Sequence, residues 1–216
     1  RRPPRSTPLY SSAASDVYKR QAQIQKQVPD VRFAIAAFKE SQAEFARTLT
    51  QPLSLDIEVY TGRTPELMQA ATCCMACSGS VSLELMYHGK PTVILYHMSK
   101  LMHRYARLMV NVRYITLVNL IASSKPFEPL KEAWRPDDPD CEDIPMPEYP
   151  TCTDKSDEVA QHIVDWLTDE QQYQETVSQL ATLSEMYGHP GASQRAATFI
   201  LESLTGQSRR TSKTAA

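Results

Sequence analysis

The chain alternates short apolar runs with segments in which apolar residues recur at helical spacing. Val31–Phe38 is typical of a buried strand, and Ser41–Leu49 has the period of a helix. Ile57–Tyr60 predicts a second strand. Pro65 follows in a position typical of the first turn of a helix, where a missing backbone N–H costs nothing.

The same alternation continues through the middle of the chain. A run of small and apolar residues, Cys73–Cys77, predicts a third strand. The turn Ser78–Ser80 leads into a helix that should end at Gly89, and Thr92–Tyr96 predicts another strand. These elements form a strand, turn, helix, strand unit around which the rest of the chain is organised.

Beyond this unit we expect a helix over Ser99–Val110, a strand over Tyr114–Leu117 and a long irregular loop over residues 123–153. Three further helices are expected over Ser156–Leu167, Glu170–Tyr187 and Ala192–Leu204. Strands that alternate with helices at this spacing predict an α/β fold, a doubly wound parallel sheet, here with a helical C-terminal tail.

The domain organisation follows from composition. Residues 1–21 are rich in Arg, Pro and Ser and have no amphipathic period, so we expect a non-native or disordered leader of the kind produced when adapter sequence is read as coding. Residues 22–205 should form one domain, with an acidic, proline-rich insertion at 123–153. Residues 206–216 should form a disordered tail.

Composition narrows the class of protein. The 216 residues carry a net charge of −2, which gives no general basic footprint for nucleic acid, and the sequence has no apolar run of transmembrane length. The cysteines number five, an odd count that favours reduced thiols in a cytoplasmic protein. Cys74 and Cys77 have metal or redox spacing, but no second pair completes a zinc site. We interpret them as small core residues and expect no metal.

The turn Ser78–Ser80 is a candidate anion site. A Gly/Ser turn at a helix N-terminus presents backbone N–H groups and the positive end of the helix dipole, and in such sheets ligands lie at the carboxyl ends of the strands. Glu84, one turn further, could accept hydrogen bonds from a sugar diol. The alternative is a plain helix N-cap with Glu84 as a solvated helix residue.

Three blocks of sequence resemble a known family. They are Ser78-Gly79-Ser80-Val81-Ser82-Leu83-Glu84, Gly89-Lys90-Pro91-Thr92-Val93 and Tyr114-Ile115-Thr116-Leu117-Val118-Asn119-Leu120-Ile121-Ala122. In this order they resemble the lipid-A-disaccharide synthases, over residues 23–205. The resemblance implies the Rossmann-like, carboxyl-terminal half of a two-domain GT-B glycosyltransferase.

The activity implied by the resemblance is transfer of 2,3-diacylglucosamine from UDP to 2,3-diacylglucosamine 1-phosphate. The products are the β-1,6-linked lipid A disaccharide, formed with inversion, and UDP, and no cofactor is implied. The family's general base is expected in an amino-terminal domain that has no counterpart here. We therefore expect no catalytic residue in this chain and no activity from the chain alone.

The resemblance also implies roles for individual residues. Ser78, Gly79 and Ser80 would bind the UDP diphosphate, Glu84 would hold the ribose, and Asn119 would line the donor pocket.

The sequence departs from the family pattern at several positions near this pocket. His97 stands where the family has an arginine, and a protonated histidine could still contact phosphate. Val118 replaces a proline. The family's later Pro-Glu motif corresponds best to Glu148 in this chain, with Glu128 as the competing assignment.

Two other functions remain open at this point. One is a related two-domain transferase that adds N-acetylglucosamine from UDP to a lipid-linked muropeptide. The other is a non-catalytic nucleotide-sugar binding module. The block around Asn119 favours the lipid A enzyme.

The acylated substrates imply a cytoplasmic protein peripheral to the inner membrane. Lys100–Arg113 mixes basic residues with Leu and Met, as a helix on an anionic lipid surface would. The alternative is a helix packed on the core with a solvated basic side. The apolar residues of the C-terminal helices would pair two copies of the chain in a homodimer or leave it prone to aggregation.

Overall fold

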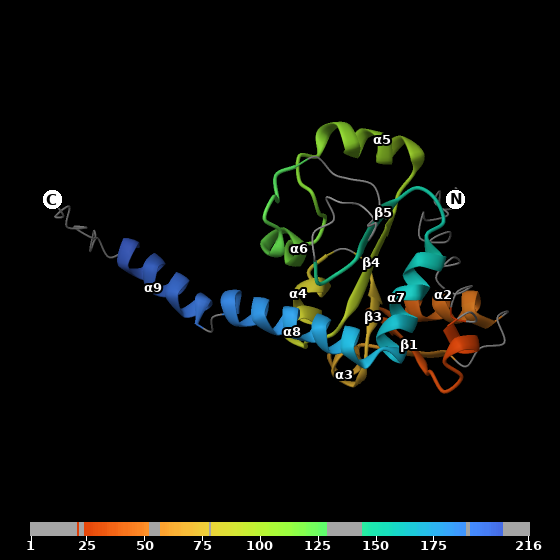
Figure 1. Cartoon of the computed structure of the whole chain (residues 1–216). Coiled ribbons are helices and arrows are strands. Elements are labelled where there is room, and N and C mark those ends of the chain that lie inside the picture. The colour runs from red at the N-terminus through yellow and green to blue at the C-terminus, as the bar shows by residue number, and fades with distance from the viewer. Residues whose placement is uncertain are drawn as a thin grey trace, which may run out of the picture.

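A computed structural model describes residues 21, 24–51, 57–77, 79–128, 144–188 and 191–204. Strands and helices alternate through most of this part of the chain (Figure 1). The strands are β1 (Phe33–Ala37), β2 (Ile57–Thr61), β3 (Cys74–Ala76), β4 (Thr92–His97) and β5 (Glu148–Thr151). The helices are α2 (Glu40–Thr50), α3 (Thr64–Ala70), α4 (Val81–Tyr87), α5 (Lys100–Met109), α6 (Leu117–Ala122), α7 (Ser156–Thr168), α8 (Glu170–Tyr187) and α9 (Ala192–Leu204).

Every strand pair in the described part of the chain is parallel. β1 pairs with β2, and β3, β4 and β5 form a second sheet in that order. The α/β class with parallel strands, predicted from the alternation, is confirmed, and the fold is Rossmann-like.

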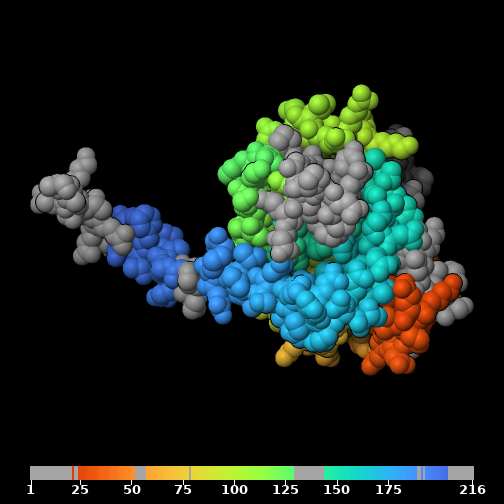
Figure 2. Space-filling model, viewed as in Figure 1, coloured from red at the N-terminus to blue at the C-terminus, as the bar shows by residue number. Residues whose placement is uncertain are grey.

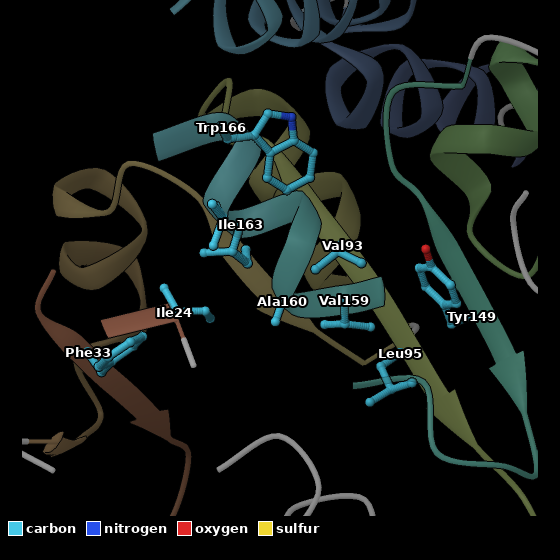
Figure 3. Close-up of a cluster of buried hydrophobic side chains, with 10 residues drawn as sticks. Ile24, Phe33, Val93, Leu95, Tyr149, Val159, Ala160, Ile163 and Trp166 are labelled. Carbon is cyan, nitrogen blue, oxygen red and sulfur yellow. The ribbon is translucent and has the colours of Figure 1, made fainter. Parts of the chain in front are cut away.

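Two hydrophobic cores lie on opposite faces of the β3-β4-β5 sheet. The α7-side core contains Ile24, Phe33, Val93, Leu95, Tyr149, Val159, Ala160, Ile163, Val164 and Trp166. The α4-side core contains Met68, Leu85, Met86, Ile94, Val118, Met146, Leu180 and Leu183. Because side chains alternate along a strand, neighbouring residues of β4 belong to different cores. Figure 3 shows α7 with Val159, Ala160 and Ile163 against Val93 and Leu95 of β4.

The cysteines of β3 follow the same alternation. Cys73, just before the strand, packs against the α7-side core and Cys74 against the α4-side core. Burial raises the pKa of the Cys73 thiol to about 12 and that of Cys74 to about 11. Both are therefore protonated and unreactive near neutral pH. The interpretation as a small core residue is confirmed for Cys74 and is wrong for Cys77, whose side chain is exposed.

The strand expected over Tyr114–Leu117 is wrong, because Leu117 begins the helix α6. Thr116 is its N-cap, and the side chain of Thr116 accepts a hydrogen bond from the Asn119 backbone N–H. The backbone N–H groups of Ile115 and Thr116 donate to the carboxylate of Glu148 rather than to a neighbouring strand. A contact with a residue far along the chain thus overrides the local strand propensity.

The irregular loop expected over residues 123–153 is wrong at its C-terminal end, where β5 pairs with β4. Pro150 lies within β5 opposite Tyr96. A proline is tolerated there because β5 is an edge strand and one of its sides needs no ladder of N–H donors. Residues 129–143 lie outside the described part of the chain, as do residues 1–20 and the tail from 205 onward.

Candidate functional site

The turn between β3 and α4 is the first part of the candidate site. The backbone N–H of Ser82 donates to the Gly79 carbonyl at 3.3 Å, and that of Leu83 donates to the Ser80 carbonyl at 3.1 Å. Ser80 occupies the N-cap position without a side-chain capping bond. The serine-cap alternative therefore has no support at Ser80, while Ser78 lies outside the described residues.

Helix α4 is short, and its C-terminal end is defined by backbone hydrogen bonds. Gly89 adopts a positive φ of 60°, its N–H donates to the Met86 carbonyl, and the N–H of Lys90 donates to the Leu85 carbonyl. This pair of bonds is a Schellman motif, which confirms the predicted stop at Gly89. Glu84, in the middle of α4, has an exposed side chain, as a residue that meets a ligand from solvent must.

A buried carboxylate forms the second part of the site. Glu148, at the start of β5, is 3% exposed. Its Oε1 accepts hydrogen bonds from the Thr116 N–H at 2.9 Å and from Asn119 Nδ2 at 2.8 Å, and the Thr116 hydroxyl also donates to it. Its Oε2 accepts from the Ile115 N–H at 2.7 Å. The carboxylate thus holds the N-terminus of α6 against the sheet.

Asn119 completes this network from within α6. Its side chain is fully buried, and Nδ2 donates to the Met146 carbonyl at 2.6 Å as well as to Glu148. Its Oδ1 accepts from the Met146 N–H at 3.3 Å. The predicted contact of Asn119 and Glu148 with UDP stays a prediction, and the structure adds that the two side chains bind each other.

Burial and hydrogen bonding shift the pKa of Glu148 in opposite directions. Removal of the carboxyl group from water raises its pKa, while the bonds from Thr116, Ile115 and Asn119 favour the charged form and lower it. Burial is the larger effect, and the pKa lies above its usual value.

The register of the sheet places the end of β3, where the turn begins, and Glu148 of the buried network at the same height along the strands. Ala76, the last residue of β3, pairs with Ile94 of β4, and Ile94 pairs with Glu148. Paired residues point to the same face, so Glu148 faces the side on which α4 and α6 pack. With strands about 4.8 Å apart, Glu148 lies about 10 Å from the end of β3.

Two further predicted residues, His97 and Glu128, lie outside the buried network. His97 ends β4, pairs with Thr151 and is partly buried. Glu128 forms an ion pair of 3.1 Å with the buried Arg113. Glu148, the preferred counterpart of the family's glutamate, is the residue that does bind Asn119.

Sequence reasoning missed Thr116, which contributes a backbone and a side-chain donor to Glu148. A signal was present in the sequence, because a threonine three residues before Asn119 fits an N-cap as well as a strand end.

The parallel strands, with hydrophobic cores on both faces of the β3-β4-β5 sheet, define the class of protein, a Rossmann-like α/β domain. A family model described as lipid-A-disaccharide synthetase matches residues 11–139, which include the β3–α4 turn and α6. The chain therefore belongs to the lipid-A-disaccharide synthetase family. The match begins inside residues 1–21, whose assignment as a leader stays a prediction.

Curated relatives agree with this assignment. The chain is 25% identical to a lipid-A-disaccharide synthase of Geobacter sulfurreducens over 185 residues, which is 86% of this chain and 43% of the relative. It is 28% identical to one of Chromohalobacter salexigens, over 82% of this chain and 41% of the relative. The chain thus spans about two fifths of the length of these relatives. No solved structure matches the chain.

No helix within the described residues is both long and apolar enough to span a bilayer.

Proposed function

We propose that the chain is the donor-binding part of a glycosyltransferase of lipid A biosynthesis. The enzyme transfers 2,3-diacylglucosamine from UDP to 2,3-diacylglucosamine 1-phosphate and releases the β-1,6-linked disaccharide and UDP, with inversion. The observation that carries the proposal is the family match over residues 11–139, which contains the turn and α6. The polar network at the level where β3 ends supports it.

In this proposal the β3–α4 turn binds the diphosphate. The Ser82 and Leu83 amides already donate to carbonyls of the turn, so the phosphate oxygens would accept from the amides of Gly79, Ser80 and Val81. His97 would add positive charge when protonated. Stabilising the charge that develops on departing UDP is the main catalytic task of this half of the site.

Glu84 and the buried network would have different roles. The exposed carboxylate of Glu84 is available to accept hydrogen bonds from the ribose hydroxyls. Asn119 and Glu148 would act as positioning residues, because their side-chain bonds attach α6 to β5 and to the Met146 carbonyl. The general base would belong to the part of the relatives that this chain does not span. The chain alone should therefore not catalyse the transfer.

Because the proposed substrates are acylated, we infer that the enzyme is peripheral to the cytoplasmic face of the inner membrane. The C-terminal helices support a homodimer, because Phe199, Ile200 and Leu201 of α9 are all exposed.

Titration of UDP into the chain tests the proposal by calorimetry. We expect measurable binding, and we expect Glu84→Ala to weaken it about tenfold through loss of the ribose hydrogen bonds. Glu66→Ala, which removes an exposed glutamate from the first turn of α3, is the matched control and should bind like the parent.

The two outcomes that contradict the proposal are distinct. Equal affinity of the parent and Glu84→Ala would remove Glu84 from the ribose role. Absence of UDP binding to the folded parent chain would contradict the assignment of the donor-binding part.

A further inference from the structure

We propose that α5 is a membrane-surface helix that inserts one side between the lipids of an anionic bilayer and places its basic edge among the phosphate groups. The inference rests on the surface of α5 itself. It deepens the proposed peripheral membrane location, on which it rests, by naming the helix that contacts the lipid, on a surface outside the donor site.

The helix exposes more apolar surface than it covers. None of its residues is buried. Its apolar face consists of Leu101 (80% exposed), Met102 (55%), Tyr105 (56%), Leu108 (76%) and Met109 (62%). Figures 1 and 2 place α5 at the periphery of the molecule, beyond the end of β4. The alternative of a helix packed on the core, left open by the sequence, is therefore wrong for these side chains.

The arrangement around the helix axis separates apolar from basic groups. At about 100° per residue, the apolar face falls within one arc of about 120°. Lys100, Arg104 and Arg107 fall together in a second arc, which we call the basic edge. His103 and Ala106 are partly buried and lie on the remaining side. The helix thus contacts the protein with the side that carries His103 and Ala106 and presents the other two outward.

Charge complementarity selects an anionic lipid surface as the occupant. The helix has no acidic residue, although the chain as a whole carries a net charge of −2. A protein interface that covered the apolar face would also have to desolvate the lysine and arginines beside it, and the helix offers them no acidic partner. In the head-group layer the same cations neutralise lipid phosphates while Leu and Met enter the acyl boundary.

The structure also limits the surface to α5. Arg113, part of the basic stretch predicted from the sequence, is 5% exposed and paired with Glu128. It lies away from the lipid in this arrangement. Because α5 covers only ten residues, its binding should be reversible and sensitive to salt.

The position of α5 has a consequence that rests on the proposed transferase function. Ser99 caps the helix through a 3.2 Å bond from the Met102 N–H and lies two residues after His97, at the carboxyl end of β4. A bilayer under α5 would therefore lie near the edge of the sheet where the nucleotide is proposed to bind. A lipid-linked sugar could reach that edge while its acyl chains remain in the membrane.

Co-sedimentation of the full chain with vesicles tests the proposal. We expect binding to vesicles of phosphatidylcholine mixed with phosphatidylglycerol, and at least about tenfold weaker binding to phosphatidylcholine alone. Leu101→Ser with Leu108→Ser should weaken binding to the mixed vesicles about tenfold or more by removing apolar contact. Lys100→Gln with Arg104→Gln should have a similar effect and should reduce the salt dependence, because only Arg107 of the basic edge remains.

The matched control is Phe199→Ser with Leu201→Ser, which removes exposed apolar side chains from a different helix and should leave vesicle binding unchanged. Circular dichroism confirms that each variant is folded. Equal binding of the parent and the Leu101/Leu108 variant would overturn the proposal, as would absence of binding to mixed vesicles. A change in oligomeric state of that variant without a change in vesicle binding would instead assign the face to a second copy of the chain. UDP affinity, measured separately, reports on the transferase proposal alone.

Discussion

A carboxylate as buried as that of Glu148 is costly unless its oxygens accept hydrogen bonds. Here both oxygens do so, and the donors come from Ile115, Thr116 and Asn119. The same bonds fix the start of α6, so the side chain that carries the charge also defines a secondary-structure boundary. At the scale of the residue, the hydrogen bonds that make burial of Glu148 tolerable therefore also determine where α6 begins.

Glu148→Gln should lower the free energy of unfolding by about 1–3 kcal/mol. The amide keeps the shape of the side chain, but its NH₂ group must face at least one donor that the carboxylate accepted, and that donor loses its partner. Urea unfolding at neutral pH, followed by circular dichroism, measures the change.

Glu84→Gln is the control for this substitution, because Glu84 is exposed on α4 and its amide analogue should leave stability unchanged. Equal stability of Glu148→Gln and the parent would show that the carboxylate does not hold the N-terminus of α6 against the sheet.

At the scale of the element, β5 and α7 are joined by a buried polar contact within the α7-side core. The Tyr149 hydroxyl and His162 Nε2 are 2.8 Å apart, and the His162 ring lies 5.9 Å from that of Trp166. Burial lowers the pKa of His162 from 6.5 to about 4, and the charge of Asp165 opposes this only in part. The imidazole is therefore neutral in the folded protein near neutral pH.

Stability should consequently fall in mild acid. Between about pH 6.5 and pH 4 the unfolded chain binds a proton at His162 and the folded chain does not, so the free energy of unfolding decreases as the pH falls. The full effect of His162 is about 3 kcal/mol. Urea unfolding at a series of pH values gives the slope for the parent and for His162→Gln, which should lose this contribution.

His88→Gln is the matched control, since His88 is exposed at the end of α4 and its removal should preserve the slope. The same pH dependence in the parent and in His162→Gln would show that another group is responsible.

The elements that could be predicted from the sequence are those whose pattern is local. β4 is a continuous apolar run because both faces of it are covered, and α4 ends at a glycine that takes a positive φ. β5 escaped prediction because it has only four residues, includes Pro150 and begins with a buried glutamate. None of these features is typical of a core strand.

The candidate site divides in the same way. The turn residues Gly79 and Ser80 were recognisable because turn chemistry depends on neighbouring residues. The bond between Asn119 and Glu148 joins residues 29 positions apart, and it requires α6 where the sequence favoured a strand. Spacing along the chain holds no information on such a contact, so the network could be found only in the structure.

At the scale of the whole molecule, the last helix, α9, leaves the body of the domain. Leu180 and Leu183 anchor α8 in the α4-side core, whereas α9 projects away from the sheets (Figure 1). Phe199, Ile200 and Leu201 of α9 are 60%, 55% and 62% exposed. Consecutive exposed residues of this size are unfavourable in water and mark a surface that another protein surface should cover.

We therefore expect the chain to self-associate, so that light scattering coupled to size exclusion gives a mass above that of a monomer. Phe199→Ser with Leu201→Ser should shift the mass toward that of a monomer, because it removes the apolar contact between the α9 helices of two copies. Leu101→Ser with Leu108→Ser, which alters α5 instead, should leave the mass unchanged if lipid rather than protein covers that helix. A monodisperse monomer of the parent chain would contradict the expectation. The two double variants thus separate the surface proposed for lipid from the surface proposed for a second copy, because each should change one measurement and preserve the other.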